Sequence, residues 1–95
     1  MQLEIAEAAL DEAQAARDHY ASIRPELGDD FAAELSHALW WVTSYPLAWA
    51  RIGHNARRRL LTRFPYGVVY RLEPNLIRVV AVMHQRQRPG YWRGR

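Results

Sequence analysis

The first half of the chain has the hydrophobic spacing of helices. Residues 2–5, QLEI, alternate apolar and polar side chains as a short strand does. Apolar positions then recur at helical spacing over residues 7–23, which predicts a first helix. Arg24-Pro25 ends this helix, because the residue before a proline avoids helical angles. Residues 27–30, LGDD, supply a turn and a capping acid, and a second helix runs from Phe31 to Tyr45.

The second half changes to the period of two that marks strands. We place three strands near residues 57–64, 67–73 and 76–84. Both connections are short and contain proline with glycine or asparagine, so the three strands form an antiparallel meander. The predicted fold is α+β: an N-terminal short strand, a two-helix hairpin, then a three-stranded antiparallel meander packed on the helices. We expect one domain over residues 1–95, with residues 86–95 as a basic C-terminal tail.

Sorting the strand residues by parity gives an apolar face and a basic face. The apolar face, which we expect to pack on the helices, contains Leu60, Thr62, Phe64, Val68, Tyr70, Leu72, Ile77, Val79, Ala81 and Met83. The opposite face contains Arg59, Arg63, Arg71, Arg78 and His84, over a floor of Leu61, Val69, Val80 and Val82. This alternation predicts that residues 57–71, RRRLLTRFPYGVVYR, hold five arginines without placing charge in the core.

The charge is strongly segregated along the chain. Residues 1–50 contain nine acids and two arginines, whereas residues 51–95 contain eleven arginines and one acid, Glu73. With so little local counter-charge, the predicted basic face indicates an anionic partner, either nucleic-acid phosphate or an acidic protein segment. The alternative is a solvated face whose arginines pair with acids of the helices.

Several classes of protein are excluded or disfavoured. The chain has no cysteine, and its start lacks the basic region and long apolar run of a signal peptide, so we expect a cytoplasmic protein. No apolar window approaches the length of a membrane-spanning helix. His19, His37 and His54 show no ligand spacing, so we expect neither a metal nor another cofactor.

Aromatic residues gather in two places. Trp40, Trp41, Tyr45 and Trp49 lie at the end of the second predicted helix and in the loop after it. One helix face cannot bury two adjacent tryptophans, so one of them covers a loop or meets a partner. In the tail, Tyr91 and Trp92 stand between arginines, and they either dock onto another surface or fold back over the sheet.

The order strand, helical hairpin, meander resembles the RelE/ParE superfamily of toxins from bacterial type II toxin–antitoxin modules. The specific parts are RRRLLTRFPYGVVYRLE at 57–73 and IRVVAVMHQRQRPGYW at 77–92, and the resemblance covers nearly the whole chain. It implies a growth-inhibiting toxin of a plasmid-stabilisation type, neutralised by a cognate antitoxin with which it forms a hetero-oligomer.

The resemblance leaves three possibilities open. A ParE-like toxin poisons DNA gyrase by binding, with Arg59, Arg63, Arg71, Arg78, Arg86 and Arg88 as target contacts and Tyr91 and Trp92 as partner contacts. A RelE-like toxin cuts messenger RNA on the ribosome, with Arg63 and Arg78 on the phosphate and His84 as acid or base. An inactive relative serves only as a binding partner. The chain lacks the lysines common in RelE-like sites and its end resembles ParE-like chains, which favours non-enzymatic gyrase inhibition.

Overall fold

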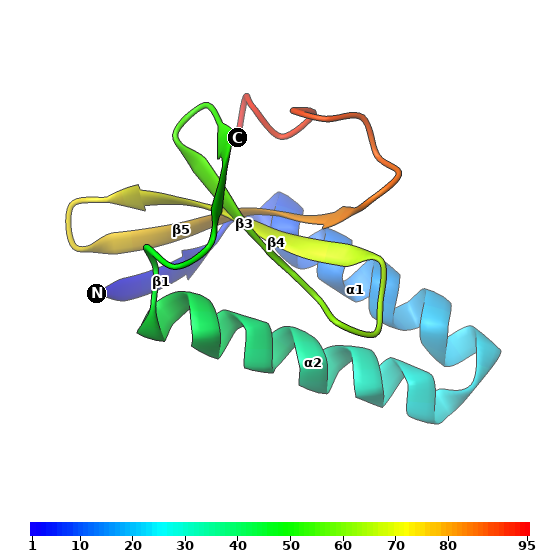
Figure 1. Cartoon of the computed structure of the whole chain (residues 1–95). Helices are drawn as coiled ribbons and strands as arrows, with labels where there is room; N and C mark the ends of the chain where they lie inside the picture. The colour runs from blue at the N-terminus through cyan, green and yellow to red at the C-terminus, as the bar shows by residue number, and fades with distance from the viewer.

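The computed structural model describes residues 1–95, which form two helices and one five-stranded sheet (Figure 1). In chain order the elements are β1 (Gln2–Ile5), α1 (Glu7–Ile23), α2 (Pro25–Ser44), β2 (Ala50–Gly53), β3 (Ala56–Leu60), β4 (Tyr66–Glu73) and β5 (Leu76–His84). The strands lie in the order β1-β5-β4-β3-β2, with β1 parallel to β5 and all other neighbours antiparallel. The predicted α+β class is confirmed, although the sheet has one strand more than expected.

The turn between the helices is shorter than predicted. Arg24 is extended, with φ −157° and ψ 132°, and Pro25 takes the first position of α2. Proline suits this position, because its missing N–H would have no partner within the helix. The prediction of a turn at residues 27–30 is therefore wrong. Gly28 allows close packing instead, since a Cβ there would lie 2.8 Å from the Cβ of Ala21 on α1. Neither helix has the apolar length needed to cross a membrane.

The larger core lies between the helices and the sheet. Three aromatic rings fill one end of it, with centroid separations of 5.5 Å for Tyr20–Phe31, 4.7 Å for Tyr20–Phe64 and 5.3 Å for Phe31–Phe64. The first pair is stacked and the other two are edge-to-face, and both arrangements add to the stabilisation from burial of the rings. The buried residues of this core are Ala9, Ala16, Phe31, Ala38, Val42, Leu61, Phe64, Val68, Tyr70, Ile77, Val79 and Val82.

A β-bulge in β5 inverts part of the predicted parity. Val69 pairs with Ala81 and Tyr70 pairs with Val79, so Val80 has no partner on β4. One extra residue reverses the alternation of every residue after it. Four predicted orientations are therefore wrong: Ala81 and Met83 lie on the face opposite the helices, and Val82 and His84 lie on the helix face.

The predicted faces for the side chains of β3 are also wrong. Arg59 pairs with Val68, which belongs to the core under the helices, so Arg59 lies on the helix face. Leu60 is 38% exposed, and the chain then leaves the strand in a bend that buries Leu61 and exposes Thr62. The parity argument failed here because it assumed that the strand continues to residue 64.

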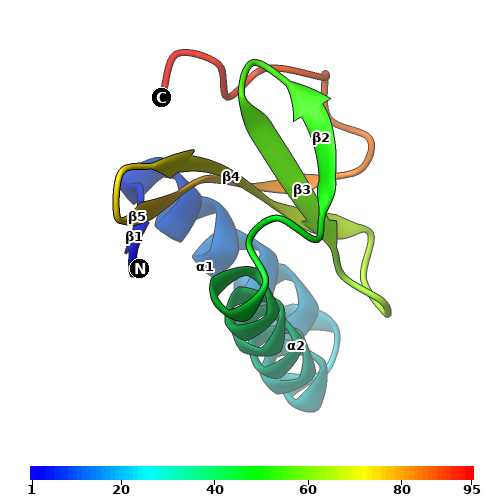
Figure 2. The ribbon, with the colours of Figure 1, turned by 60° about the vertical axis from the view of Figure 1, so that its left-hand side comes forward.

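β2 is a strand that the sequence pattern did not reveal. It forms a hairpin with β3 across His54-Asn55, and both turn residues have positive φ, 51° and 58°. Two-residue hairpin turns of the most favoured type require this geometry. Its residues, ARIG, include one large apolar side chain, Ile52, and three of the four are exposed, so the hydrophobic pattern gives little signal. Figure 2 shows β2 at the outer edge of the sheet, beyond the end of α2.

Residues 85–95 turn back over the sheet face opposite the helices (Figure 1). Trp92 is 2% exposed and belongs to a second, smaller core with Ala56, Val69, Val80, Ala81 and Met83. Of the two arrangements expected for Tyr91 and Trp92, the tail takes the one that folds back. The sheet is therefore covered on both faces.

Candidate functional site

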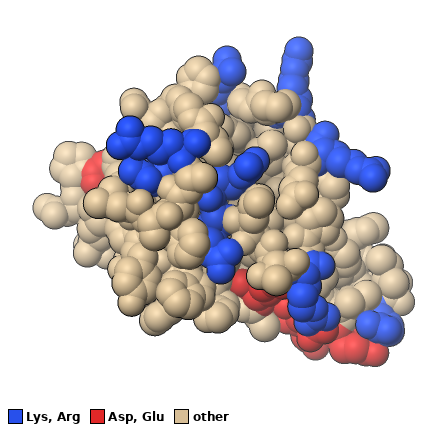
Figure 3. Space-filling model, viewed as in Figure 1, with Lys and Arg blue, Asp and Glu red and all other residues tan.

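The thirteen arginines fall into two groups according to their partners. Five form ion pairs with carboxylates, at N–O distances of 2.8 to 3.6 Å: Arg17, Arg24, Arg63, Arg78 and Arg95. Eight have no carboxylate partner: Arg51, Arg57, Arg58, Arg59, Arg71, Arg86, Arg88 and Arg93. Figure 3 shows basic side chains over much of this face, with most of the visible acidic side chains at the lower right, on the side of the α1–α2 turn.

The arginines predicted to form one basic face are dispersed. Arg71 and Arg78 lie directly opposite each other on β4 and β5, on the face away from the helices. Arg59 lies on the helix face, and Arg63 lies in the bend after β3, where its Nη2 is 3.4 Å from Asp30 of α2. The single basic face is therefore wrong, and the bend after β3 is the main reason.

Two of the predicted anion-binding arginines are already paired within the chain. Arg78 Nε lies 2.9 Å from Glu73 Oε2, and Arg78 Nη1 lies 3.5 Å from Glu4 Oε1. The hydrogen bond from Arg78 lowers the pKa of Glu73, and the same bond raises the pKa of Arg78. Arg63 is paired with Asp30 in the same way. These carboxylates compete with any outside anion for the two guanidinium groups.

The three catalytic candidates of the nuclease mechanism are not brought together. His84 and Arg78 lie at opposite ends of β5, about 20 Å apart at the rise of a strand, and on opposite faces of the sheet. The rings of His84 and Tyr66 pack edge-to-face with their centroids 5.0 Å apart, and His84 Nδ1 accepts the backbone N–H of Arg86 at 3.0 Å. Arg63 points to α2. No three His, Asp or Glu side chains gather as a metal site would require.

A group of side chains fastens the tail to the body, and we call it the tail clasp: Glu12, Arg71, Tyr91, Trp92 and Arg95. Glu12 accepts hydrogen bonds from Tyr91 Oη at 2.5 Å, from Arg95 Nη1 at 2.8 Å and from the backbone N–H of Val82 at 3.0 Å. Burial raises the pKa of Tyr91, and the bond to Glu12 raises it further. One carboxylate of α1 therefore holds both the sheet and the tail.

Arg71 holds the tail from the other side. Its Nη1 and Nη2 donate to the carbonyl oxygens of Arg95 and Arg93, at 3.0 and 3.2 Å. Its guanidinium carbon lies 5.5 Å from the centre of a ring of Trp92. Arg71, predicted to contact a target, is therefore engaged with the protein's own tail.

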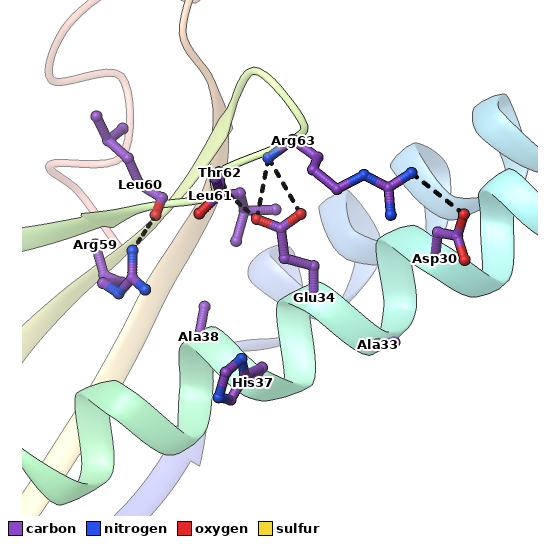
Figure 4. Close-up of a pocket in the computed structure, with 10 residues that line it drawn as sticks. All are labelled: Asp30, Ala33, Glu34, His37, Ala38, Arg59, Leu60, Leu61, Thr62 and Arg63. Atoms are coloured by element: carbon purple, nitrogen blue, oxygen red, sulfur yellow. Dashed lines mark hydrogen bonds and ion pairs between the residues drawn. The ribbon is translucent and has the colours of Figure 1, made fainter.

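A groove of about 400 Å³ lies between α2 and the segment that follows β3 (Figure 4). Glu34 points into the middle of it and accepts the backbone N–H groups of Thr62 and Arg63. Asp30 and Glu34, the acids of this groove, both bond to the chain itself, so they fasten the bend to α2. At the other end Arg59 lies near His37, and its Nε is buried without a hydrogen-bond partner.

Exposed apolar side chains at the end of α2 and in the loop after it precede β2 and β3, whose arginines lack carboxylate partners. We call these side chains the hairpin surface: Trp40, Tyr45, Leu47, Arg51, Arg57 and Arg59. The exposed fractions are 54% for Trp40, 54% for Tyr45 and 69% for Leu47. Arg57 Nη1 donates to the carbonyl oxygens of Leu47 and Trp49, at 3.1 and 2.9 Å. The guanidinium of Arg59 lies 4.5 Å from the centre of the Trp49 ring.

The sequence predicted only part of this surface. It indicated that Trp40 or Trp41 contacts a loop or a partner, but it did not connect either with Arg51 and Arg57. A usable signal was present, since residues 35–50 contain no Asp, Glu or Arg and are followed by four arginines within nine positions. The connection depends on β2, which returns the chain to β3 beside the end of α2.

Comparisons with known proteins agree with this architecture. Residues 3–89 match the model of a family described as the ParE toxin of the type II toxin-antitoxin system, parDE. Among solved structures, the chain is similar to one from the chromosomal ParDE TA system from P. aeruginosa, with a TM-score of 0.72 and 19% sequence identity. That match covers 88% of this chain and 95% of the other, and at this identity it shows the fold alone. No curated protein sequence matches the chain.

Proposed function

The chain belongs to the ParE toxin family of type II toxin–antitoxin systems, and on this premise we propose that it inhibits growth by binding DNA gyrase. In this proposal the toxin makes and breaks no bond itself, and it stops a step of the gyrase cycle by occupying a site on that enzyme. A cognate antitoxin neutralises it by forming a hetero-oligomer. Because gyrase acts on the chromosome, the protein works in the cytoplasm.

The separation of His84 from Arg63 and Arg78 is the observation that favours gyrase binding over RNA cleavage. An acid or base must come within about 3 Å of the proton that it transfers, and donors to a phosphate need similar contact. Arg78 lies at the far end of β5 with two carboxylates, and Arg63 is paired with Asp30. This arrangement supports an inhibitor that acts by binding and does not favour a nuclease.

We assign the first contact with gyrase to Arg86 and Arg88. Both are exposed and have no carboxylate partner. The turn that carries them is ordered by reciprocal bonds, since the His84 N–H donates to Gln87 Oε1 at 2.8 Å and the Gln87 N–H donates to the His84 carbonyl at 3.0 Å. A pre-ordered backbone lowers the entropy lost on binding.

The other predicted contacts have lesser roles in this proposal. Arg59 and Arg71 lack carboxylates but are held by Trp49 and by the tail, and Arg63 and Arg78 are paired. Tyr91 and Trp92 position the tail, and they reach a partner only when the tail leaves the sheet.

The test is an assay of purified gyrase on plasmid DNA. Adding the protein should reduce supercoiling or accumulate cleaved DNA, and the variant Arg86→Glu/Arg88→Glu should be weaker by about tenfold or more, since it reverses two contact charges. The matched control Arg17→Glu/Arg24→Glu reverses two exposed arginines, one on α1 and one in the turn between the helices, and should act like the unchanged protein. Gyrase that keeps full activity would sink the proposal.

The two competing possibilities have separate readouts. A ribosome-dependent nuclease leaves discrete cuts in the message of a cell-free translation reaction, and His84→Ala abolishes them. An inactive relative leaves growth unchanged when the chain is induced without an antitoxin. We expect intact message and arrested growth, with growth restored by co-expression of the cognate antitoxin.

A further inference from the structure

The groove between α2 and the bend after β3 contains one guanidinium group that lacks an anion (Figure 4). Arg63 is paired with Asp30 at 3.4 Å. Glu34 accepts the backbone N–H groups of Thr62 and Arg63. Arg59, at the other end of the groove, has no carboxylate partner. Both acids of the groove are therefore engaged with the chain, and Arg59 is left without a counter-ion.

Arg59 occupies a position where a strand normally places an apolar residue. It lies opposite Val68, which is 0% exposed, on the face that packs on the helices. Its guanidinium carbon lies 4.5 Å from the centre of the Trp49 ring, and its Nη1 donates to the Leu60 carbonyl. Its Nε is buried, and neither Nε nor Nη2 has an acceptor in the chain. A buried donor without a partner costs stability, so an arginine here indicates a use other than the fold.

α2 supplies the facing wall of the groove. Its lining residues recur at intervals of three and four, which places them on one face of the helix: Ala33, Glu34, His37 and Ala38. Figure 4 shows His37 and Ala38 at the same end of the groove as Arg59. The His37 ring stacks on Trp40 with the centroids 6.1 Å apart. This end of the groove therefore combines an imidazole and a guanidinium with the apolar side chains of Ala38 and Leu61.

These features select the chemistry of a ligand. A volume of about 400 Å³ lies in the range of small-molecule sites. The planar N–H groups of a guanidinium suit a carboxylate or a phosphate. Glu34 lies in the middle of the groove, so a doubly charged phosphate ester meets more repulsion there than a single carboxylate does. The alanine and leucine side chains suit an apolar body attached to that carboxylate.

We propose that this groove binds a small organic acid. The carboxylate of the acid accepts hydrogen bonds from Arg59 Nη2 and from His37, and its apolar body packs against Ala38 and Leu61. The site does not include Arg86 or Arg88, the residues assigned to gyrase. The inference therefore holds whether or not gyrase is the target, and its failure leaves the gyrase assay unaffected.

The probe is phenylacetate, titrated against the whole protein while tryptophan fluorescence and backbone amide NMR shifts are recorded. Saturable shifts should appear at residues 33–38 and 59–63, and Trp49 emission should change because its ring lies against the guanidinium of Arg59. Phenylacetamide has the same shape without the charge, and it should bind about tenfold more weakly or worse. Phenyl phosphate, which is mostly a dianion at neutral pH, should also bind more weakly than phenylacetate.

Variants separate a ligand site from a structural arginine. Arg59→Leu should abolish binding of phenylacetate and raise the thermal midpoint of the free protein, since it removes a buried donor that lacks a partner. Arg59→Lys keeps the charge without the planar fork, and should bind about threefold more weakly or worse. The matched control Arg51→Leu changes an exposed arginine of β2 outside the groove, and should bind like the unchanged protein.

Three results would overturn the proposal. The first is the absence of saturable shifts in the groove at millimolar phenylacetate. The second is equal binding of phenylacetate and phenylacetamide, which would mean that no cation recognises the carboxylate. The third is unchanged binding by Arg59→Leu, and if that variant does not fold, unchanged binding by Arg59→Lys has the same meaning.

Discussion

An arginine lies against a tryptophan ring in both the tail clasp and the hairpin surface, but the two regions differ in how far they are exposed to solvent. In the tail clasp, Arg71 lies 5.5 Å from the centre of a Trp92 ring, and Trp92 is 2% exposed. In the hairpin surface, Arg59 lies 4.5 Å from the centre of the Trp49 ring, and both residues are half-buried. The pair is therefore enclosed in the tail clasp and only partly covered in the hairpin surface.

The difference follows from the hydrogen-bonding groups that lie beside each arginine–tryptophan pair. In the tail clasp, Glu12 accepts three hydrogen bonds, and Arg71 donates to two carbonyl groups of the tail. The hairpin surface has no carboxylate, and residues 35–50 supply none. An arginine and an aromatic ring are therefore enclosed where an acid completes the group, and they stay more exposed where the chain offers none.

The largest expected effect comes from removing the buried ring of the tail clasp. Trp92→Ala should lower the free energy of unfolding by about 3–5 kcal/mol, because it leaves a cavity in the smaller core. Trp40→Ala should change it by about 0.5 kcal/mol or less, since the ring is exposed. Chemical denaturation measures the free energy of unfolding of both variants. Similar losses would mean that the tail clasp contributes no more to stability than the hairpin surface.

The second-largest effect is expected from removing the carboxylate of Glu12. Glu12→Ala leaves Tyr91 Oη, Arg95 and the Val82 N–H without their acceptor, and should cost about 1–3 kcal/mol. Trypsin should then cut the tail faster than it cuts the unchanged protein. Asp11→Ala, one position earlier on α1, is the control and should leave the cleavage rate unchanged. If both variants are cut equally, Glu12 does not hold the tail.

A third test measures how the stability of the protein changes with pH, to which both regions contribute. Tyr70 Oη donates to the Pro46 carbonyl at 2.6 Å, which ties β4 to the loop of the hairpin surface, and burial raises the pKa of Tyr70 to about 12. A pKa raised above its unfolded value of 10 gives stability that is complete below pH 10 and lost as pH rises from 10 towards 12. The raised pKa of Tyr91 acts in the same direction in the tail clasp.

Tyr70→Phe separates these contributions. The variant should lose about 1 kcal/mol at neutral pH, because the Pro46 carbonyl loses its donor. It should also lose stability less steeply above pH 10, as measured by denaturant titrations at several pH values. A slope equal to that of the unchanged protein would show that Tyr70 does not titrate in this window.

The smallest effect lies in the hairpin surface. Arg51→Glu should stabilise the free protein by about 0.5 kcal/mol, since it replaces a repulsion with Arg57 by an attraction. Arg78→Ala should do the opposite, because it removes the exposed ion pair with Glu73. Thermal midpoints in low salt measure both, and a destabilising Arg51→Glu would mean that Arg51 has a role in the fold.

Particular residues show how far sequence reasoning reached. Residues 2–5 and 7–23 form the predicted strand and helix, and Val68, Tyr70, Ile77 and Val79 lie in the predicted core. The start of α2 was wrong because Pro25 begins the helix rather than a turn. The orientations after Val80 were wrong because a bulge inverted them, and this error placed His84 with the arginines.

The candidate site was predicted less well, because it depends on those orientations. Arg71 and Arg78 lie on the expected face, but each is engaged with other parts of the protein's own chain. The aromatic cluster at the end of α2 was recognised, whereas its arginine neighbours on β2 were not. The stretch ARIG, with Ile52 as its one large apolar residue, does not differ from a loop until β3 pairs with it.

The sequence by itself determined the first strand, the two helices apart from the start of α2, and the last two strands. It also determined that one face of the sheet packs on the helices and that positive charge gathers in the second half of the chain. These properties follow from local spacing and composition, which act between residues close in the chain. Only the tertiary structure decided which arginines are neutralised and which tryptophans are buried. Those outcomes depend on Glu12 reaching the tail and on β2 reaching the end of α2, and contacts between distant residues leave no periodic signal.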